Sequence, residues 1–210
     1  MVLLRKNSAR PFGFIEPCRP LKARTPPSGP QWVHEIKHDG FRLMVRREGP
    51  RMRCFTRGGH DWADRFPTIV EAANRLKAQS FMIDGEAVIC RPDGLSDFNA
   101  LRSRARGHEV TLVAFDLIEL QGDDLRDQKL IDRKRRLVKI LSKGRDGIAY
   151  NDHVQQDGAT VFDHVCRMGL EGIVSKRLDA PYRSGPSKTW LKSKNPLSEA
   201  VRREREEDWT

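Results

Sequence analysis

The amino-acid sequence predicts an α+β fold in which antiparallel sheets are flanked by helices. Apolar runs of strand length are separated by Gly, Pro and Asp-Gly turns, which is the pattern of strands that fold back on their neighbours. Other segments carry apolar residues three and four positions apart, as helices that pack one face on a sheet do. No repeat and no Gly/Ser linker divides the 210 residues, so we expect one compact unit with terminal extensions.

Regular structure is expected to begin near Trp32, after an extended Pro-rich lead-in over residues 1–30, because proline cannot continue a helix. Residues 31–37 and 41–47 are predicted to form two strands around the turn at His38-Asp39-Gly40, and a third strand extends the meander. The expected strands and helices are, in order, strand 51–56, helix 64–78, strand 81–90, helix 97–106, strand 110–117, helices 131–141 and 157–168, and strands 172–176 and 189–194. The domain is expected to span 31–196, and the charged tail 197–210 is predicted to be a solvated helix or a frayed end.

The composition favours a polyanionic partner and excludes several classes of protein. Lys and Arg number 39 and Asp and Glu 29, so the net charge is +10. The four cysteines are far apart and form no Cys-x-x-Cys pair, which favours reduced thiols over a zinc or redox motif. No secretory signal and no apolar run of membrane-spanning length is present, so we expect a cytoplasmic, nucleoid-associated protein without a membrane partner. The six histidines show no metal-ligand spacing and are expected to be structural or at the surface.

The central motif is Lys37-His38-Asp39-Gly40-Phe41-Arg42. A lysine just before a strand turn is held on a rigid element and projects into any cleft that the sheet forms. Lysine becomes a nucleophile only when it is neutral, and nearby cations or loss of solvent favour that state. Taken alone, the motif fits a surface lysine beside a hairpin better than it fits a nucleophile.

Other strands carry charged residues inside apolar runs. Asp84-Gly85-Glu86 interrupts one strand, Phe115-Asp116 another, and Glu171–Lys176 and Trp190–Lys194 two more. Charged groups are costly to bury unless they are paired or bind a ligand. We therefore expect these strands to converge on one polar cleft.

In this order, the motifs strongly resemble those of the adenylation (nucleotidyltransferase) domain of ATP-dependent DNA ligases, particularly the bacterial end-joining (ligase D-like) type. The resemblance covers about residues 14–196 and implies a nucleotidyltransferase (ATP-grasp-like) domain with sheets and helices around a nucleotide cleft. It implies that Lys37 attacks the α-phosphate of ATP, which gives lysyl-AMP and releases pyrophosphate. The AMP would then pass to a DNA 5′-phosphate for strand sealing.

The resemblance implies nucleoside contacts for four further residues. Glu35 would help to read the adenine amino group, and Phe115 would stack on the purine. Arg42 would contact the ribose or its phosphate, and Arg57 would lie near the sugar. Stacking of a base on an aromatic ring is worth about 1–3 kcal/mol in nucleic-acid complexes.

Metal and phosphate contacts are implied for five more. Glu86 would contact the ribose hydroxyl or a metal, and Glu171 would help to hold Mg²⁺ or Mn²⁺, which suits a cation that prefers carboxylate oxygens. Lys176, Lys192 and Lys194 would contact phosphates, and the last two share one face of their strand. Phosphoryl transfer needs such charge neutralisation more than acid–base catalysis.

DNA is the expected macromolecular partner, as a nicked or broken duplex contacted through its backbone. The basic runs Arg102–Arg106 and Arg133–Arg136 are expected to form helix faces that meet DNA phosphates. The residues after Lys194 are too few for the OB-fold domain that follows in these ligases, so we expect a separate OB-fold or DNA-end-binding protein to assist. The alternatives are an RNA ligase or capping-type nucleotidyltransferase, and a non-catalytic nucleotide- or DNA-binding module.

Overall fold

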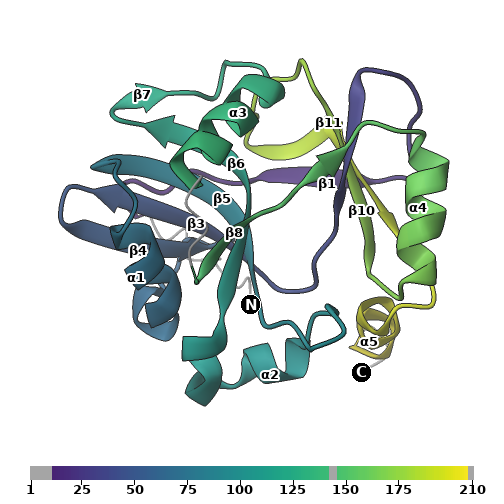
Figure 1. The fold of residues 1–210 in the computed structure, drawn as a ribbon, viewed down its shortest axis with the longest axis horizontal. Coiled ribbons are helices and arrows are strands. Elements are labelled where there is room, and N and C mark those ends of the chain that lie inside the picture. The colour runs from purple at the N-terminus through teal and green to yellow at the C-terminus, as the bar shows by residue number, and fades with distance from the viewer. Residues whose placement is uncertain (1–10, 142–145, 208–210) are drawn as a thin grey trace, which may run out of the picture.

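The structure is a computed structural model that describes residues 11–141 and 146–207. Two β-sheets form its centre, with helices α1 and α3 along one sheet and α4 along the other (Figure 1). Residues 1–10 of the expected lead-in and 208–210 of the expected tail lie outside the described residues. Within the described part of the chain, no helix is long and apolar enough to cross a membrane.

The first sheet has five strands in the order β1-β11-β10-β2-β9. Its pairs are antiparallel except for β1 and β11, which are parallel. The bounds are β1 Cys18–Lys22, β2 Trp32–Ile36, β9 His153–Val154, β10 Gly172–Arg177 and β11 Gly185–Lys194. Because β1 lies in the Pro-rich segment and pairs with β11, the expectation that regular structure begins near Trp32 is wrong.

The second sheet has the order β4-β3-β5-β6-β7, and β8 pairs with β6 in parallel. Its bounds are β3 Phe41–Glu48, β4 Arg51–Thr56, β5 Ser80–Val88, β6 Thr111–Leu120, β7 Asp123–Asp124 and β8 Ile148–Tyr150. The chain passes from β6 through β7 and α3 to β8, and such a long crossover connection is what parallel strands need. The α+β class is confirmed, but each sheet is mixed and contains one parallel pair among the antiparallel ones.

The helices largely follow the predicted segments. Their bounds are η1 Ala63–Arg65, α1 Pro67–Asn74, α2 Phe98–Arg102, η2 Arg104–Glu109, α3 Leu130–Leu141, α4 Gly158–Arg167 and α5 Glu199–Glu207, where η marks a 3₁₀ helix. Helix α4 shows why the pattern is readable. The Asp157 carboxylate accepts a hydrogen bond from the Thr160 N–H at 3.0 Å, and Gly169 follows the last turn with φ at +74°.

The predicted hairpin around His38-Asp39-Gly40 is wrong. Strand β2 belongs to the first sheet and β3 to the second, so the two strands do not pair with each other. The Asp-Gly sequence marks a crossing between sheets, because a short polar connection with glycine can form either a hairpin turn or a link between two sheets. The β3–β4 hairpin predicted next along the chain is confirmed.

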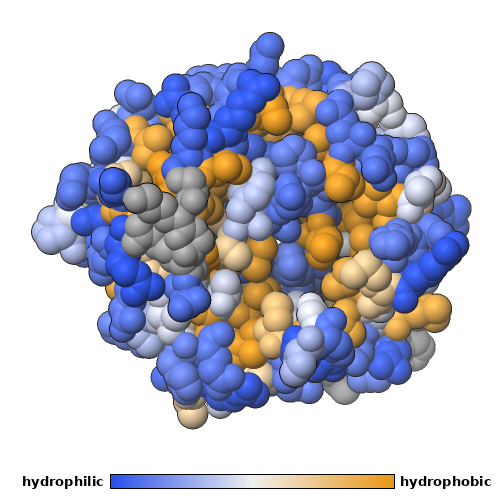
Figure 2. Space-filling model, in the orientation of Figure 1, coloured by the Kyte–Doolittle hydropathy of each residue, from blue (hydrophilic) through white to orange (hydrophobic). Residues whose placement is uncertain are grey.

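Both faces of the second sheet are buried, and alternate residues of its strands point to opposite faces. On β3, Leu43 and Val45 belong to the main core with α1 and α3, whereas Met44 packs toward the first sheet with Phe115 and Trp190. In the same orientation as Figure 1, hydrophobic residues show through the middle of the face, between hydrophilic residues at its rim (Figure 2). The space between the sheets is therefore where buried polar side chains of β3 and β5 must find partners.

The basic run on α3 does not form the predicted DNA-facing surface. Arg133 is 0% exposed and donates to both oxygens of Asp116 at 2.8 Å, and Lys134 is 1% exposed. Only Arg135 and Arg136 of this run retain solvent contact. In the other run, Arg102 and the residues to 105 are exposed.

Candidate active site

The loop over residues 37–40 crosses from one sheet to the other and carries Lys37. The Lys37 backbone N–H donates to the Gly172 carbonyl of β10 at 2.9 Å, which ties the loop to the first sheet. At its other end, a Cβ on Gly40 would lie 2.2 Å from the Ala87 carbonyl oxygen of β5. Only glycine permits so close an approach to the second sheet. The loop is thus fixed on both sides, and Lys37 is placed by backbone contacts.

The Lys37 ammonium faces a buried carboxylate. Its Nζ lies 2.6 Å from Oε1 of Glu171, whose side chain is 5% exposed. Lys194 approaches the same oxygen at 3.5 Å. Glu171 Oε2 is buried and has no hydrogen-bond partner within the described residues. Glu171 therefore contacts two lysines through one carboxylate oxygen, and its other oxygen is left without a partner among the described residues.

A second group of polar side chains comes from the face of the second sheet that points toward the first. Arg42 of β3 is directly opposite Glu86 of β5. The Arg42 guanidinium donates to both oxygens of Asp84 at 2.5 and 2.7 Å, and it lies 4.5 Å from the centre of the Phe115 ring. Because Asp84 is 0% exposed, this pair forms a rigid floor beneath the aromatic ring.

Glu35 of β2 forms a buried triad with two lysines. Its carboxylate accepts from Lys134 at 2.7 Å and from Lys176 at 2.6 Å, and all three side chains are 1% exposed. Lys176 also lies 4.2 Å from the Phe115 ring centre and 4.0 Å from that of Trp190. In this structure both Glu35 oxygens hold lysines, so the carboxylate sets the position of Lys176 at the cavity wall.

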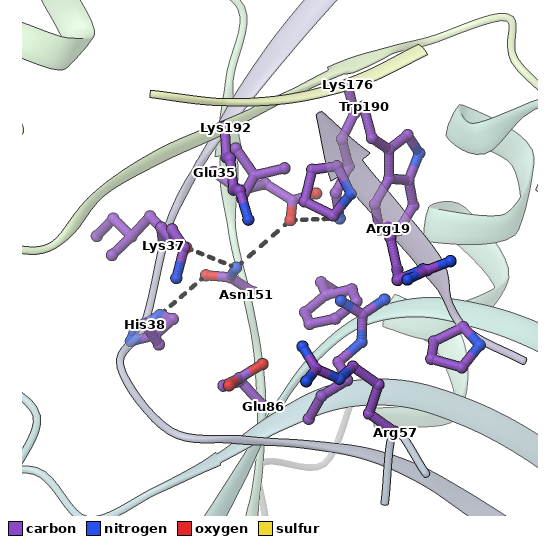
Figure 3. Close-up of a pocket in the computed structure, with 16 residues that line it drawn as sticks. Arg19, Glu35, Lys37, His38, Arg57, Glu86, Asn151, Lys176, Trp190 and Lys192 are labelled. Atoms are coloured by element: carbon purple, nitrogen blue, oxygen red, sulfur yellow. Dashed lines mark hydrogen bonds and ion pairs between the residues drawn. The ribbon is translucent and has the colours of Figure 1, made fainter. Parts of the chain in front are cut away.

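These groups surround one cavity of about 210 Å³ (Figure 3). Eight of the residues predicted from the sequence line it: Glu35, Lys37, Arg42, Arg57, Glu86, Phe115, Lys176 and Lys192. Arg57 is an exposed residue of this lining. Glu171 and Lys194 are outside the described lining and reach the site through their contact beside Lys37. The strands therefore converge on one cleft as predicted, but the expectation is wrong for Asp116, which is bound by Arg133 of α3 and does not line the cavity.

The sequence reasoning missed several lining residues, above all His38 and Asn151. The His38 Nε2 and Asn151 Oδ1 atoms are 3.2 Å apart, and Asn151 Nδ2 donates to the Ile36 carbonyl at 3.2 Å (Figure 3). Asn151 follows β8, a three-residue strand that periodicity does not reveal. His38 is adjacent to the nucleophile candidate, and that position was the available signal. Arg19 of β1 also lines the cavity, because the lead-in strand joins the sheet.

The electrostatics of the cavity shift two pKa values toward neutrality. Burial raises the pKa of Glu86 to about 7, and the positive charges of Lys37 and Arg42 oppose this effect. Burial lowers the pKa of Lys176 to about 8, against the attraction of Glu35 and together with repulsion by Lys134. Both groups therefore change charge near physiological pH, which is common where a site binds charged ligands.

The acidic residues fit a hard divalent cation. Glu86 and Glu171 interact electrostatically with each other, and the buried Oε2 of Glu171 lacks a partner among the described residues. Mg²⁺ is commonly held by one or two carboxylates together with substrate phosphates and water. Across the described residues, no group of three or more His, Cys, Asp or Glu side chains could hold a metal by itself. Such a cation would thus need the substrate as a further ligand.

Comparison with known proteins gives a consistent family. The family model described as ATP dependent DNA ligase domain matches residues 17–194. The protein named Multifunctional non-homologous end joining protein LigD from Pseudomonas aeruginosa is 38% identical over 188 residues, which are 88% of this chain and 22% of that protein. A probable DNA ligase from Dictyoglomus turgidum is 31% identical over 76% of this chain and 30% of its own length. This chain spans between a fifth and a third of these relatives.

Solved structures show the same fold. Mycobacterial DNA ligase D complexed with ATP and MES has a TM-score of 0.73 and 28% identity, over 85% of this chain and 59% of that one. Chlorella virus DNA ligase-adenylate has a TM-score of 0.61 and 20% identity, over 86% of this chain and 69% of that one. At that identity, the viral protein supports the fold alone.

Proposed function

This chain belongs to the ATP-dependent DNA ligase family and corresponds to its adenylation domain, and we propose that it transfers AMP from ATP to Lys37. The observation that carries the proposal is the position of Lys37. Its Nζ is held 2.6 Å from Glu171 at the wall of a cavity lined by basic and aromatic side chains. A nucleophile fixed beside its substrate gains the rate advantage of an intramolecular reaction.

The proposed step forms one bond to phosphorus and breaks one, and the Lys37 nitrogen gives up two protons. The Lys37 ammonium first passes one proton to Glu171 Oε1, the carboxylate in contact with it, from which the proton exchanges with solvent; the second proton leaves the nitrogen for solvent as the N–P bond forms. The neutral Nζ attacks the α-phosphorus of ATP, the bond from that phosphorus to the bridging oxygen of the β-phosphate breaks, and pyrophosphate leaves with the bonding electron pair. The product is a lysyl-AMP phosphoramidate. Negative charge develops on the phosphate oxygens, so cations around the α-phosphate lower the barrier.

The remaining lining residues bind and orient ATP in this proposal. Phe115 stacks on the purine, with its ring held from behind by Arg42. Arg57 lies near the sugar, and Lys176 and Lys192 contact phosphates. Support comes from the burial of Lys176, whose ammonium is fixed by Glu35 and therefore requires little reorganisation during the reaction. The Glu35 carboxylate would help to read the adenine amino group only through an oxygen that also accepts from a lysine.

A divalent cation, Mg²⁺ or Mn²⁺, would supply positive charge at the phosphate oxygens when bound. Glu86 and Glu171 would hold it together with the substrate. Below pH 7 Glu86 takes up a proton, because burial raises its pKa to about 7, and it then becomes a poorer ligand. Lys194, which contacts Glu171, would act beside this centre.

We further propose that the AMP passes to the 5′-phosphate of nicked or broken DNA, so that a strand can be sealed. Several relatives are named multifunctional non-homologous end joining proteins, and this chain spans 22% and 25% of the length of two of them. An OB-fold module or a DNA-end-binding protein would then complete the sealing. The segment Arg102–Arg106, in which residues 102–105 are exposed, is the surface proposed to meet the DNA backbone, rather than the buried half of the α3 run.

The proposal is tested by incubating the protein with ATP and Mg²⁺ or Mn²⁺ and then measuring its intact mass. The expected result is an adduct of one AMP in the wild type and in Lys188→Ala, which removes an exposed lysine of β11, and none in Lys37→Ala. Absence of an adduct with every metal would refute self-adenylation and favour a binding module. An adduct formed from GTP instead would favour a capping-type enzyme. A nicked-duplex assay with and without an added OB-fold ligase module tests the sealing step.

A further inference from the structure

Helix α5 is anchored beside the Lys37 loop instead of extending into solvent as a charged tail. Two residues of its first turn are buried, Ala200 at 4% exposure and Val201 at 9%. Just before the helix, the Asn195 N–H donates to the Glu171 carbonyl at 2.8 Å. The sequence-based expectation of a solvated helix or frayed end is therefore wrong for its first turn. The segment that leads into α5 is therefore hydrogen-bonded to the backbone of Glu171, whose side chain faces the Lys37 ammonium.

The helix then holds the loop itself. Arg203 Nη2 donates to both carboxylate oxygens of Asp39, at 2.7 and 2.8 Å. The same guanidinium lies 4.0 Å from the ring centre of Phe98, which belongs to α2 (Figure 1). The two charged side chains are only 24% and 17% exposed. Because Asp39 lies two residues after Lys37, the ion pair acts on the loop that carries the nucleophile.

Together these contacts make α5 a strap between the two sheets. Its start is tied to the first sheet beside Glu171, and Arg203 reaches α2, whose Phe98 packs against the core of the second sheet. Between α5 and the loop remains a crevice of about 30 Å³, lined in part by Lys37, Asp39 and Ala200. Such a space is large enough for water but not for a nucleotide.

The position of α5 is one from which it supports the nucleophile without blocking ATP. The larger cavity shares Lys37 with the small crevice, but none of its described lining residues belongs to α5. Release of the strap would leave the nucleotide contacts in place. It would free Asp39 and so loosen one side of the loop that sets where Nζ lies.

We propose that Arg203 is a positioning residue for self-adenylation, which fixes Lys37 by holding Asp39. The inference rests on the proposed function above. A lysine that samples several positions reacts more slowly, and misplacement by 1 Å can cost about 100-fold in rate. Since ATP contacts other elements, loss of Arg203 lowers the maximal rate and leaves the ATP concentration for half-maximal rate unchanged.

The test measures the rate of lysyl-AMP formation as a function of ATP in matched variants. Arg203→Ala is expected to lose roughly tenfold in maximal rate, with half-saturation changed less than about twofold. Arg203→Lys restores part of the rate because it keeps the charge. Arg202→Ala, an exposed arginine of the same helix, reacts as the wild type does. An unchanged or faster reaction in Arg203→Ala, or a change confined to half-saturation, overturns the proposal.

Two further measurements make the result specific. In an Asp39→Asn background, Arg203→Ala should have no additional effect, because the residue acts through that carboxylate; two independent, additive losses would contradict this route. Hydrogen exchange of peptides covering residues 37–42 is measured without ATP and should speed up in Arg203→Ala but not in Arg202→Ala. If the wild type forms no lysyl-AMP, the proposed function fails, and the exchange experiment alone decides whether Arg203 holds the loop: unchanged exchange overturns it.

Discussion

Replacing Glu35 with glutamine tests how much the buried pairing of one carboxylate with two lysines contributes to the stability of the protein. The substitution keeps the shape of the side chain and removes the charge that two ammonium groups share. Lys134 comes from α3 and Lys176 from β10, so the carboxylate joins elements that are far apart in the sequence. We expect a large loss of stability that depends on pH in a defined direction.

The magnitude follows from distance and burial. At 2.6 and 2.7 Å and an effective dielectric of about 20, each contact is worth roughly 6 kcal/mol of Coulomb attraction before desolvation is subtracted. Removing one partner of a buried ion pair costs about 3–5 kcal/mol, since the remaining charge stays buried without compensation. Here two charges remain, but the pKa of Lys176 is already lowered to about 8 by burial and falls further without Glu35. Its deprotonation limits the loss.

The sign of the pH effect is fixed by that pKa. When the pKa of a lysine is lower in the folded state than in the unfolded state, the protein becomes more stable as the pH rises from the first value to the second. In Glu35→Gln the folded-state pKa of Lys176 is lower than in the wild type, so this gain begins at lower pH. The loss of stability caused by the substitution therefore shrinks between pH 6 and pH 9. Urea unfolding at both pH values measures it. Asp179→Asn, which removes an exposed partner of Arg177, is the control and should stay within about 0.5 kcal/mol. A Glu35→Gln deficit below about 1 kcal/mol, or one independent of pH, would refute the reasoning.

Three other substitutions, one of them with a matched control, test separate parts of the structure. Because burial raises the pKa of Glu86 to about 7 in the folded state, ionising this side chain costs stability above pH 4.5. Glu86→Gln removes that cost, so thermal melts should show a gain in stability relative to the wild type between pH 5 and pH 8. Adenylation by Glu86→Gln should be slower, and its rate should not show the increase near pH 7 that ionisation of Glu86 gives the wild type. Arg133→Met leaves Asp116 buried without its cation, so urea unfolding should show a loss of about 3–5 kcal/mol. Arg135→Ala should instead leave stability unchanged within about 0.5 kcal/mol. Gly40→Ala places a methyl group against a β5 carbonyl, so lysyl-AMP formation should fall about 100-fold while ATP still binds in calorimetry.

The predicted polar cleft shows what strand periodicity can reveal. A charged residue inside an apolar strand must point to a face where a partner exists, and alternation assigns Arg42, Asp84 and Glu86 to one face of the second sheet. From that rule the convergence of several strands could be predicted without knowing their order. The order itself could not be predicted, because β2 and β3 look like a hairpin in sequence and are separated only by pairing with distant strands.

Charge runs were the least readable signal. Arg133 and Lys134 are adjacent to Arg135 and Arg136 in a helix, and only their spacing from Leu130 and Leu137 places the first two on the buried face. These two side chains are buried because each has a carboxylate partner. Arg133 pairs with Asp116 on a strand of the second sheet, and Lys134 pairs with Glu35 on a strand of the first. Only the tertiary structure pairs them. For the same reason, the sequence of α5, which is almost all charged, does not reveal that Asp39 is the partner of Arg203.

The position of Lys37 between the sheets links the fold to the chemistry. Its backbone is bound to β10 of the first sheet, and its ammonium faces Glu171 at the start of that strand. Glu86, the other carboxylate of the site, comes from β5 of the second sheet. The binding of a cation by both carboxylates therefore depends on how the two sheets are aligned. In the proposed reaction, the α5 strap therefore influences reactivity without touching the substrate, because Arg203 holds the loop that carries Lys37.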